Sequence, residues 1–480
     1  MPLRTPEQFK ASLHDGRRVY IAGARVKDVV THPVLSVCTE HAANLYRLNR
    51  DRKLKELFTF TSPETGKTVS RYFMIPRTPL DLLQRGDLIE AHTAANKSVL
   101  DLLKAVGTDA LLALLVVSRD MDKALKTSYN KRVQKFFSYC RENDLSLATA
   151  QTDVKGDRSL RPHEQPDPDM YVRIVRRRKD GIVIRGAKAH TTAAPQANEI
   201  FLLPTRAMTE ADADYALACA VPANAKGVTL MCRPMPGPEH AVFDFPVSRT
   251  HMETETLTVF DDVFVPNERV FMAGEWQFAG ALANTFATFH RHTAVSYKPP
   301  SADLLLGAAA LAADLNGVRN EGHIREKLSR LVMYTEIVRA CRKMAAYEAI
   351  MTPSGIMMPN PIYTNAGKFH FANNFHEVAK IVQDIAGGLA ITAPSEADLK
   401  SKEIGKYVEK YLAGRKGTTG RERLRVMSLI RDYTASDFGG YNYVVTLHGE
   451  GSMAAQQIVA LRDYDVERCV RLAREAMGAG

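Results

Sequence analysis

The sequence contains no apolar run near the roughly eighteen residues that a membrane-spanning helix needs, and it does not open on an apolar targeting segment. Its six cysteines are widely spaced without a C-x-x-C pair, which excludes zinc-ribbon and thioredoxin-like motifs and predicts reduced thiols. Neither a G-x-G-x-x-G fingerprint nor a Walker loop stands where a strand would lead into a helix. We therefore expect a cytoplasmic protein with no membrane partner and no Rossmann-type dinucleotide site.

Positive charge is in excess. Lysine and arginine total 64, aspartate and glutamate total 54, and the net charge is +10. Such a surface favours anionic partners, among them phosphorylated cofactors, coenzyme A esters and carboxylates. The clearest basic run, Arg176 to Lys179, precedes an Asp-Gly turn and is typical of a solvated hairpin end. No RNA-binding or zinc-finger signature accompanies it, so we expect no nucleic-acid partner.

Apolar periodicity divides the chain into three parts. Residues 1–145 are predicted to be mainly helical, because Val99, Leu102, Leu103 and Val106 recur at three- and four-residue spacing. Residues 146–275 carry β-branched runs between Gly- and Pro-bearing turns, a pattern typical of an antiparallel β domain. Amphipathic stretches return from 276 to 480 and predict a helical bundle. The length and the 45% hydrophobic content favour an α+β protein of more than one domain.

The first candidate site segment, residues 147–158, stands at the entry to the β domain. Thr149 and Thr152 offer hydroxyls that could bond the pyrimidine edge of a flavin, and Lys155 and Arg158 could meet a pyrophosphate. The segment would equally serve as a polar interdomain loop.

The second candidate segment, residues 186–194, directly follows the predicted hairpin. Its small residues would let a planar ligand approach the backbone, with Lys188 and Thr191 or Thr192 as polar contacts. An ordinary transition from strand to loop is the alternative.

Two further segments offer acid–base groups. His290 and His292 lie on a predicted helix, so at most one of them is expected to enter a given site as general acid or base; two partly exposed helix histidines are the alternative. Glu450 stands between Gly449 and Gly451 ahead of a predicted helix, where small residues could receive a phosphate or a flavin edge. Glu450 is a candidate base, or a charge that complements the helix dipole.

Taken in order along the chain, these segments resemble the 4-hydroxyphenylacetate 3-hydroxylase family, and most closely its 4-hydroxybutyryl-CoA dehydratase branch. The resemblance runs almost end to end, through residues 25–30, 157–158, 167–173, 181–190, 204–208, 260–266, 289–291, 384–388 and 394–398. It implies an acyl-CoA-dehydrogenase-like fold, with FAD between the β domain and the C-terminal bundle. It also implies a homotetramer, a dimer of dimers, in which subunits share flavin contacts.

The sequence departs from both branches at their reactive positions. The dehydratase branch holds a [4Fe–4S] cluster with three cysteines and one histidine; the histidine remains as His290, but Asp101, Ala105 and Tyr297 stand at the cysteine positions. Clusters need thiolates, so we expect no iron–sulfur cluster and no other metal. The hydroxylase branch clamps its phenol with an arginine and a tyrosine, which fall here at Val106 and Ala110, and its active-site histidine falls near Thr149.

Three functions remain open. The first is a two-component monooxygenase that takes FADH2 from a separate flavin reductase and hydroxylates a small substrate, aromatic or not. The second is a cluster-free dehydratase-like or vinylacetyl-CoA isomerase-like enzyme, in which His290 or Glu450 abstracts a proton beside the thioester. The third is a flavin-binding protein without catalysis. In each, we expect FAD or FADH2 to contact Thr149, Thr152, Lys155, Arg158, Lys188, Thr191, Gly449 and Gly451, with His290 and Glu450 as catalytic candidates.

Overall fold

The computed structural model describes residues 3–478. Its N-terminal part is mainly helical, and the long helix α5 runs through it with most of its side chains buried. The carboxylate of Asp101 caps α5 by accepting a hydrogen bond from Leu103 N at 3.0 Å. The elements are α1 (Pro6–Ala11), β1 (Val19–Ile21), β2 (Ala24–Val26), α2 (Leu35–Leu48), α3 (Lys55–Phe58), β3 (Thr59–Thr61), β4 (Thr68–Ser70), α4 (Pro79–Ala95), α5 (Leu102–Leu125) and α6 (Tyr129–Glu142).

The middle part builds two sheets. The strands are β5 (Leu147–Ala150), β6 (Arg173–Arg178), β7 (Gly181–Thr192), β8 (Glu199–Leu202), β9 (Leu217–Pro222), β10 (Val228–Cys232), β11 (Glu255–Pro266) and β12 (Val270–Ala273). One sheet has the order β2-β1-β10-β11-β7-β6 and the other β12-β9-β8-β5. The expected hairpin is β6–β7, with its basic residues exposed.

The expectation of a purely antiparallel β domain needs correction. Strand β5 pairs in parallel with β8, and β1, from the N-terminal part, pairs in parallel with β10. In each of these parallel pairs the two strands are far apart in sequence. Parallel strands need long crossover connections, and the periodicity of a strand does not reveal its partner. The remaining pairs in both sheets are antiparallel.

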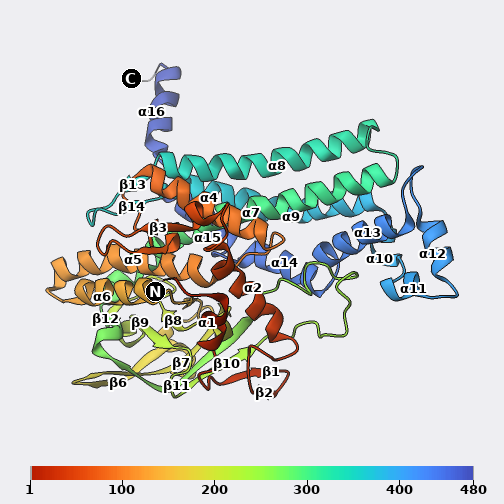
Figure 1. The fold of residues 1–480 in the computed structure, drawn as a ribbon. Helices are drawn as coiled ribbons and strands as arrows, with labels where there is room; N and C mark the ends of the chain where they lie inside the picture. Colours follow the sequence, from red (N-terminus) through yellow and green to blue (C-terminus); the bar gives the residue numbers. More distant parts are fainter. Residues whose placement is uncertain (1–2, 479–480) are drawn as a thin grey trace.

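The C-terminal part is a bundle in which α7, α8 and α9 lie side by side above the sheets (Figure 1). The elements are α7 (Trp276–Leu315), α8 (Gly322–Tyr347), β13 (Ile350–Met351), β14 (Met357–Met358), α9 (Pro361–Ala386), α10 (Leu389–Thr392), α11 (Glu396–Lys400), α12 (Gly405–Leu412), α13 (Gly420–Thr434), α14 (Asp437–His448), α15 (Met453–Asp463) and α16 (Val466–Ala476). Helix α16 projects away from the body. Within residues 3–478, no helix has the length and apolarity needed to cross a bilayer.

The connection between β10 and β11 reaches across to the bundle. Val247 N and Ser248 N donate hydrogen bonds to Asp432 Oδ2 at 2.8 and 2.9 Å, and the Ser248 hydroxyl donates to Asp432 Oδ1 at 2.6 Å. Asp432 lies on α13 and is fully buried. One carboxylate therefore joins the sheet connection to the helical bundle.

Helix α5 packs against β5 at a point where only glycine fits. A Cβ atom added at Gly107 would lie 2.2 Å from Leu147 Cβ and 2.9 Å from Leu147 O. Such close contact lets α5 lie directly on β5, the strand with which the first candidate segment begins. The sequence of this helix therefore positions the candidate site as well as the core.

We expect Gly107→Ala to lower the free energy of unfolding by about 1–3 kcal/mol, because overpacking outweighs the gain in helix propensity. Urea unfolding followed by circular dichroism would measure the change. Gly307→Ala on α7 is the control, since nothing lies within 4 Å of a Cβ added there. That variant should keep or raise the stability. Equal behaviour of the two variants would show that the contact with Leu147 is unimportant.

Candidate functional site

The first two candidate segments meet at the end of β7. Ala189 N donates a hydrogen bond to Thr152 O at 2.9 Å, so residues 151–153 run alongside the strand. Thr149 on β5 and Thr152 are both half-buried, and the Thr149 hydroxyl donates to Val106 O of α5 at 3.4 Å. The structure thus brings two separate segments of the β region together next to α5.

The predicted cationic contacts differ in how available they are. Lys188 is buried, and its Nζ donates to Asp153 Oδ1 at 2.5 Å, Gln151 O at 2.7 Å and Leu203 O at 3.0 Å. All three of its donors therefore serve the protein itself. Lys155 and Arg158 are exposed on the following loop. Lys188 ties the loop to the strand in this structure, and its contact with a cofactor stays a prediction.

The end of β7 also contacts the C-terminal bundle. The Thr192 hydroxyl donates to the Glu255 carboxylate at 2.9 Å, and the Tyr441 hydroxyl of α14 donates to Glu255 Oε1 at 2.8 Å. Burial raises the pKa of Glu255. Thr191, which precedes Thr192 on β7, is fully buried, and its hydroxyl has no hydrogen-bond partner within residues 3–478. Successive strand residues point to opposite faces, so Thr191 is a buried hydroxyl without a partner on the face opposite Thr192.

Glu450 connects α14 to α15 in a left-handed backbone conformation, with φ of 58°. Its side chain is 3% exposed, and Oε1 accepts a hydrogen bond from the Tyr297 hydroxyl of α7. Burial raises the pKa of Glu450 to about 8. The adjacent Gly451 has φ of 95°, a backbone conformation that favours glycine, and it lies close to the Arg291 guanidinium. Glu450 is thus a buried carboxyl poised to exchange a proton near neutral pH.

Three buried cations surround this carboxyl. Lys298 Nζ lies 3.5 Å from Glu450 Oε2, and Lys368 Nζ lies 3.8 Å from the same oxygen. Arg291 Nε donates to Glu450 O at 3.1 Å. Burial lowers the pKa of Lys368 to about 7 and the pKa of Lys298 well below its usual range. We call Arg291, Lys298 and Lys368 the buried cation cluster.

His290 is held beside a second carboxylate. Its Nδ1 lies 3.7 Å from Asp109 Oδ2, and its ring stacks on Phe286 at 5.2 Å between centroids. Arg85 donates to Asp109 Oδ1 at 2.6 Å, and the Thr293 hydroxyl donates to Oδ2 at 2.7 Å. Asp109 is therefore fixed and can orient the imidazole.

The two histidines of α7 point into different surroundings, as expected for residues two positions apart on a helix. His290 is partly exposed, whereas His292 is 1% exposed and burial lowers its pKa to about 3. No hydrogen bond or ion pair joins His290 to Glu450 within residues 3–478. The two catalytic candidates therefore belong to separate polar groups, His290 on α7 and Glu450 in the connection between α14 and α15.

The positions aligned with cluster cysteines hold groups that do not ligate iron–sulfur clusters. Asp101 is buried, burial raises its pKa to about 7, and its Oδ2 lies 3.6 Å from His92 Nε2. Ala105 and Tyr297 lie in the same apolar core cluster. Among residues 3–478, no group of three or more histidines, cysteines and acids is arranged to hold a metal ion. These residues do not fit a [4Fe–4S] cluster, because none supplies a thiolate.

Three of the candidate side chains have polar atoms that suit the chemistry of a flavin better. Thr191 Oγ1, His290 Nδ1 and Glu450 Oε2 are buried, and each lacks a hydrogen-bond partner in the described chain. Buried polar atoms in folded proteins are nearly always paired, so a ligand rich in donors and acceptors would satisfy them. The pyrimidine edge and ring nitrogens of an isoalloxazine offer such groups.

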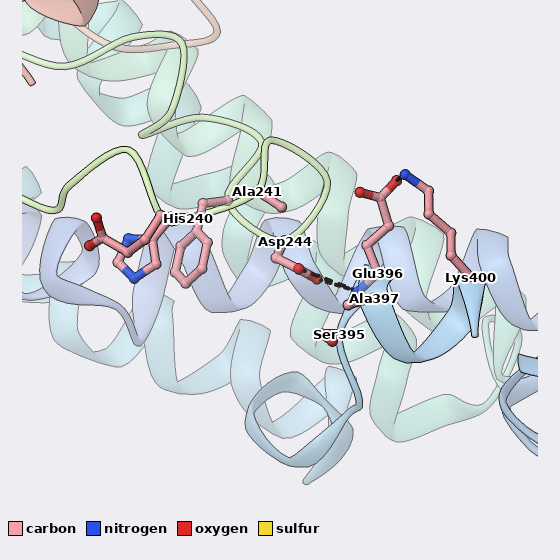
Figure 2. A pocket seen from close by; sticks show the side chains of 9 residues that line it. His240, Ala241, Asp244, Ser395, Glu396, Ala397 and Lys400 are labelled. Carbon is pink, nitrogen blue, oxygen red and sulfur yellow. Dashed lines mark hydrogen bonds and ion pairs between the residues drawn. The ribbon is translucent and has the colours of Figure 1, made fainter. Parts of the chain in front are cut away.

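A separate surface cavity of about 440 Å³ lies between the β10–β11 connection and α11 (Figure 2). Its charged side chains are paired with protein groups: Asp244 Oδ1 accepts from Glu396 N at 3.0 Å, and Glu396 lies 2.9 Å from Lys400. None of the predicted site residues lines it. The cavity therefore does not mark the candidate site.

The sequence missed the side chains that surround the candidates. Lys368 lies on the apolar face of α9, three residues before Phe371 and seven before Phe375. A lysine at a position where the helical spacing predicts an apolar residue is the signal that could have identified it. Asp109 stands inside the apolar run of α5, with a similar signal. Arg291 was visible only as a neighbour of His290.

Two models of one protein family match this chain, and together they cover most of it. A family model described as "4-hydroxyphenylacetate 3-hydroxylase N terminal" matches residues 5–272, and one described as "4-hydroxyphenylacetate 3-hydroxylase C terminal" matches residues 279–478. The chain is 34% identical to a 4-hydroxybutyryl-CoA dehydratase/vinylacetyl-CoA-Δ-isomerase of Clostridium aminobutyricum, over 99% of both chains. It is 31% identical to a 4-hydroxyphenylacetate 3-monooxygenase oxygenase component of Thermus thermophilus, over 88% of this chain and 86% of the relative.

Two solved structures show the same fold. An oxygen-tolerant 4-hydroxybutyryl-CoA dehydratase from N. maritimus superposes with a TM-score of 0.94 and 32% identity, over 100% of this chain and 95% of the other. The oxygenase component of 4-hydroxyphenylacetate 3-monooxygenase, complexed with FAD, superposes with a TM-score of 0.91 and 28% identity, over 99% and 98%. The resemblance and the α+β fold predicted from the sequence are both confirmed.

Proposed function

Because the chain belongs to the 4-hydroxyphenylacetate 3-hydroxylase family, we propose that it is a flavin-dependent monooxygenase that receives reduced FAD from a separate reductase. Its substrate would be a small organic molecule, and aromatic compounds are the first class to test. The observation that carries the proposal is the buried, unpartnered hydroxyl of Thr191 together with Asp101, Ala105 and Tyr297 at the cluster positions. This combination retains the flavin surroundings and replaces the cluster ligands.

Bound reduced FAD would supply the electrons that activate dioxygen. The chain would supply the surroundings: Thr191 would hold the flavin edge with its buried hydroxyl, and burial among α5, α7 and the sheets would exclude water. His290, oriented by Asp109, and Glu450 would each hold or transfer a proton at a ring nitrogen or a carboxyl oxygen. Val106 and Ala110 leave no arginine–tyrosine clamp, so the substrate would differ from 4-hydroxyphenylacetate.

Turnover with reduced FAD tests this proposal. The protein would be given FADH2 from an unrelated flavin reductase, oxygen, and a panel of phenols and other small aromatic compounds. Mass spectrometry should detect a product that has gained one oxygen atom from labelled dioxygen. Release of hydrogen peroxide alone across the whole panel would argue against a monooxygenase.

A second candidate function has a specific observation in its favour. Glu450 has the buried, raised-pKa environment of a base that removes a proton beside a thioester, and the dehydratase relative matches the chain over its whole length. We therefore propose a cluster-free isomerase as the second candidate function. Deuterium exchange into vinylacetyl-CoA or crotonyl-CoA without oxygen would identify it, and the absence of exchange would exclude it for these substrates.

The assembly and domain limits are part of the proposal. We propose a cytoplasmic homotetramer with shared flavin sites and three domains, residues 1–145, 146–275 and 276–480. Exposed apolar side chains on α15 and α16, among them Ile458, Leu461 and Leu472, support an interface between subunits. Light scattering would measure the assembly size, and a monomer at micromolar concentration would contradict this part.

A further inference from the structure

The buried cation cluster gathers more basic groups than the one nearby carboxyl can pair. Arg291 is 4% exposed, Lys298 is 1% exposed and Lys368 is fully buried. Glu450 is the one acidic side chain within 4 Å of Lys298 and Lys368, and Arg291 has no ion pair within residues 3–478. Three buried basic groups therefore share one carboxyl, and burial lowers the pKa of both lysines.

Backbone carbonyls offset only part of this charge. Lys368 donates to Thr446 O at 2.9 Å, at the C-terminal end of α14, where the helix dipole favours a cation. Arg291 donates to Glu450 O, and Lys298 donates to the Tyr297 hydroxyl at 3.0 Å. These acceptors are neutral, so they satisfy hydrogen bonds but add no negative charge.

The carboxyl itself leaves a bonding position open. Oε1 of Glu450 is engaged by Tyr297, but Oε2 has no hydrogen-bond partner in the described chain, and both lysine nitrogens face it from 3.5 and 3.8 Å. Both distances exceed those of direct hydrogen bonds, which are usually 2.7–3.2 Å for N–H to O. The two lysines thus face Glu450 without donating a direct hydrogen bond to its carboxyl.

An unpaired buried charge is costly, by several kcal/mol for each ion. Burial accordingly lowers the pKa of both lysines, and an anion bound beside them would hold them in their charged forms. We propose that Lys298 and Lys368 bind an anionic oxygen of a ligand, with Arg291 adding to the positive field. The inference rests on the proposed function, because the ligand is the substrate or the flavin of that same site.

Two ligands present such an oxygen. A substrate that is bound as a phenolate or as a thioester enolate carries a delocalised oxyanion, and reduced FAD carries negative charge along its N1 and C2 carbonyl edge. Both are planar anions with the oxygen at the rim. A pair of ammonium groups stabilises either one without needing the planar fork of an arginine.

The test uses the FAD-loaded protein with Lys298→Met and Lys368→Met, which keep the length of the side chain and remove the charge. Lys380→Met on the same helix as Lys368 is the control, since Lys380 is 74% exposed. Loss of one lysine should be tolerated, because Glu450 takes up a proton near pH 8 and can become neutral. Circular dichroism and FAD stoichiometry would verify the fold of each variant.

Two probes separate the sources of the anion. Sulfite adds to oxidised flavin and places negative charge on the N1 edge, so its dissociation constant reports on cations there. 4-Nitrophenol and acetoacetyl-CoA report on substrate oxyanions, because their phenolate and enolate forms have distinct absorption. We expect at least one probe class to bind about tenfold or more weakly in both variants, as for loss of a charged hydrogen bond, and normally in Lys380→Met.

Weaker sulfite binding assigns the cluster to the flavin, and weaker binding of the oxyanion probes assigns it to the substrate; either result supports the inference. Unchanged constants for all probes in both folded variants would overturn it. These measurements need no turnover. A protein that binds the probes through the cluster but forms no oxygenated product would refute the proposed function and leave the inference intact.

Discussion

Glu450→Gln is expected to lower kcat/KM by about 10²–10⁴-fold with FAD still bound, the usual loss when a general acid or base is removed. The amide is isosteric with the carboxyl and can keep the hydrogen bond from Tyr297, but it cannot gain or release the proton. Steady-state kinetics on whichever substrate gives turnover would measure the loss. Glu467→Gln on α16 is the control, because Glu467 is exposed.

The pH profile separates a chemical role from a structural one. Burial raises the pKa of Glu450 to about 8, so a reaction that needs the carboxylate should speed up as the pH rises through about 8. A reaction that needs the neutral acid should slow over the same range. In Glu450→Gln this step in the profile should vanish. A variant that keeps the step and loses less than about threefold in rate, against the 10²-fold or more expected of a proton-transfer group, would remove Glu450 from the catalytic groups.

Lys104→Met is expected to lower the free energy of unfolding by about 3–5 kcal/mol, because it leaves the carboxylate of Asp144 buried without its cation. Lys104 of α5 and Asp144 form an ion pair in which both side chains are fully buried. The Lys104 ammonium also lies 4.3 Å from the centre of the Tyr46 ring, a further attraction that methionine would lose. Chemical unfolding monitored by circular dichroism would give the change.

Two further variants make this prediction specific. Lys123→Met on the same helix changes an exposed lysine and should leave stability nearly unaltered. Adding Asp144→Asn to Lys104→Met should recover part of the loss, because the remaining partner is then uncharged. Asparagine also tolerates the left-handed backbone at position 144, where φ is 48°. If the double variant is less stable than Lys104→Met, an unpaired Asp144 does not account for the loss.

Local patterns predict most of the elements of this fold. The β6–β7 hairpin follows from an Asp-Gly turn between β-branched runs, and α9 follows from apolar residues at helical spacing. Helix α7 shows the limit. The sequence predicts helix at His290 and His292, but no local pattern predicts a single helix from Trp276 to Leu315 that continues through Pro299 and Pro300. Prolines inside a helix cost about 3 kcal/mol or more, and packing of α7 against α4, α5, α8 and α9 offsets that cost.

The candidate site could be predicted only in pieces. The sequence identified Thr191, His290 and Glu450 as separate candidates, each with an ordinary structural alternative. It could not show that Tyr297 meets Glu450 across 153 positions, or that Lys368 approaches from α9, because such contacts depend on how helices pack. These contacts between distant parts of the chain set the charge and the pKa values of the site. The spacing of residues along one helix or strand holds no information about them.

The attachment of the β10–β11 connection to the bundle has a kinetic consequence. Val247 N, Ser248 N and the Ser248 hydroxyl all bond the same carboxylate, Asp432, so none of the three bonds can be replaced by a neighbouring acceptor when Asp432 moves. The connection and α13 should therefore separate in a single cooperative opening, which exposes both amides to exchange with solvent at the same moment.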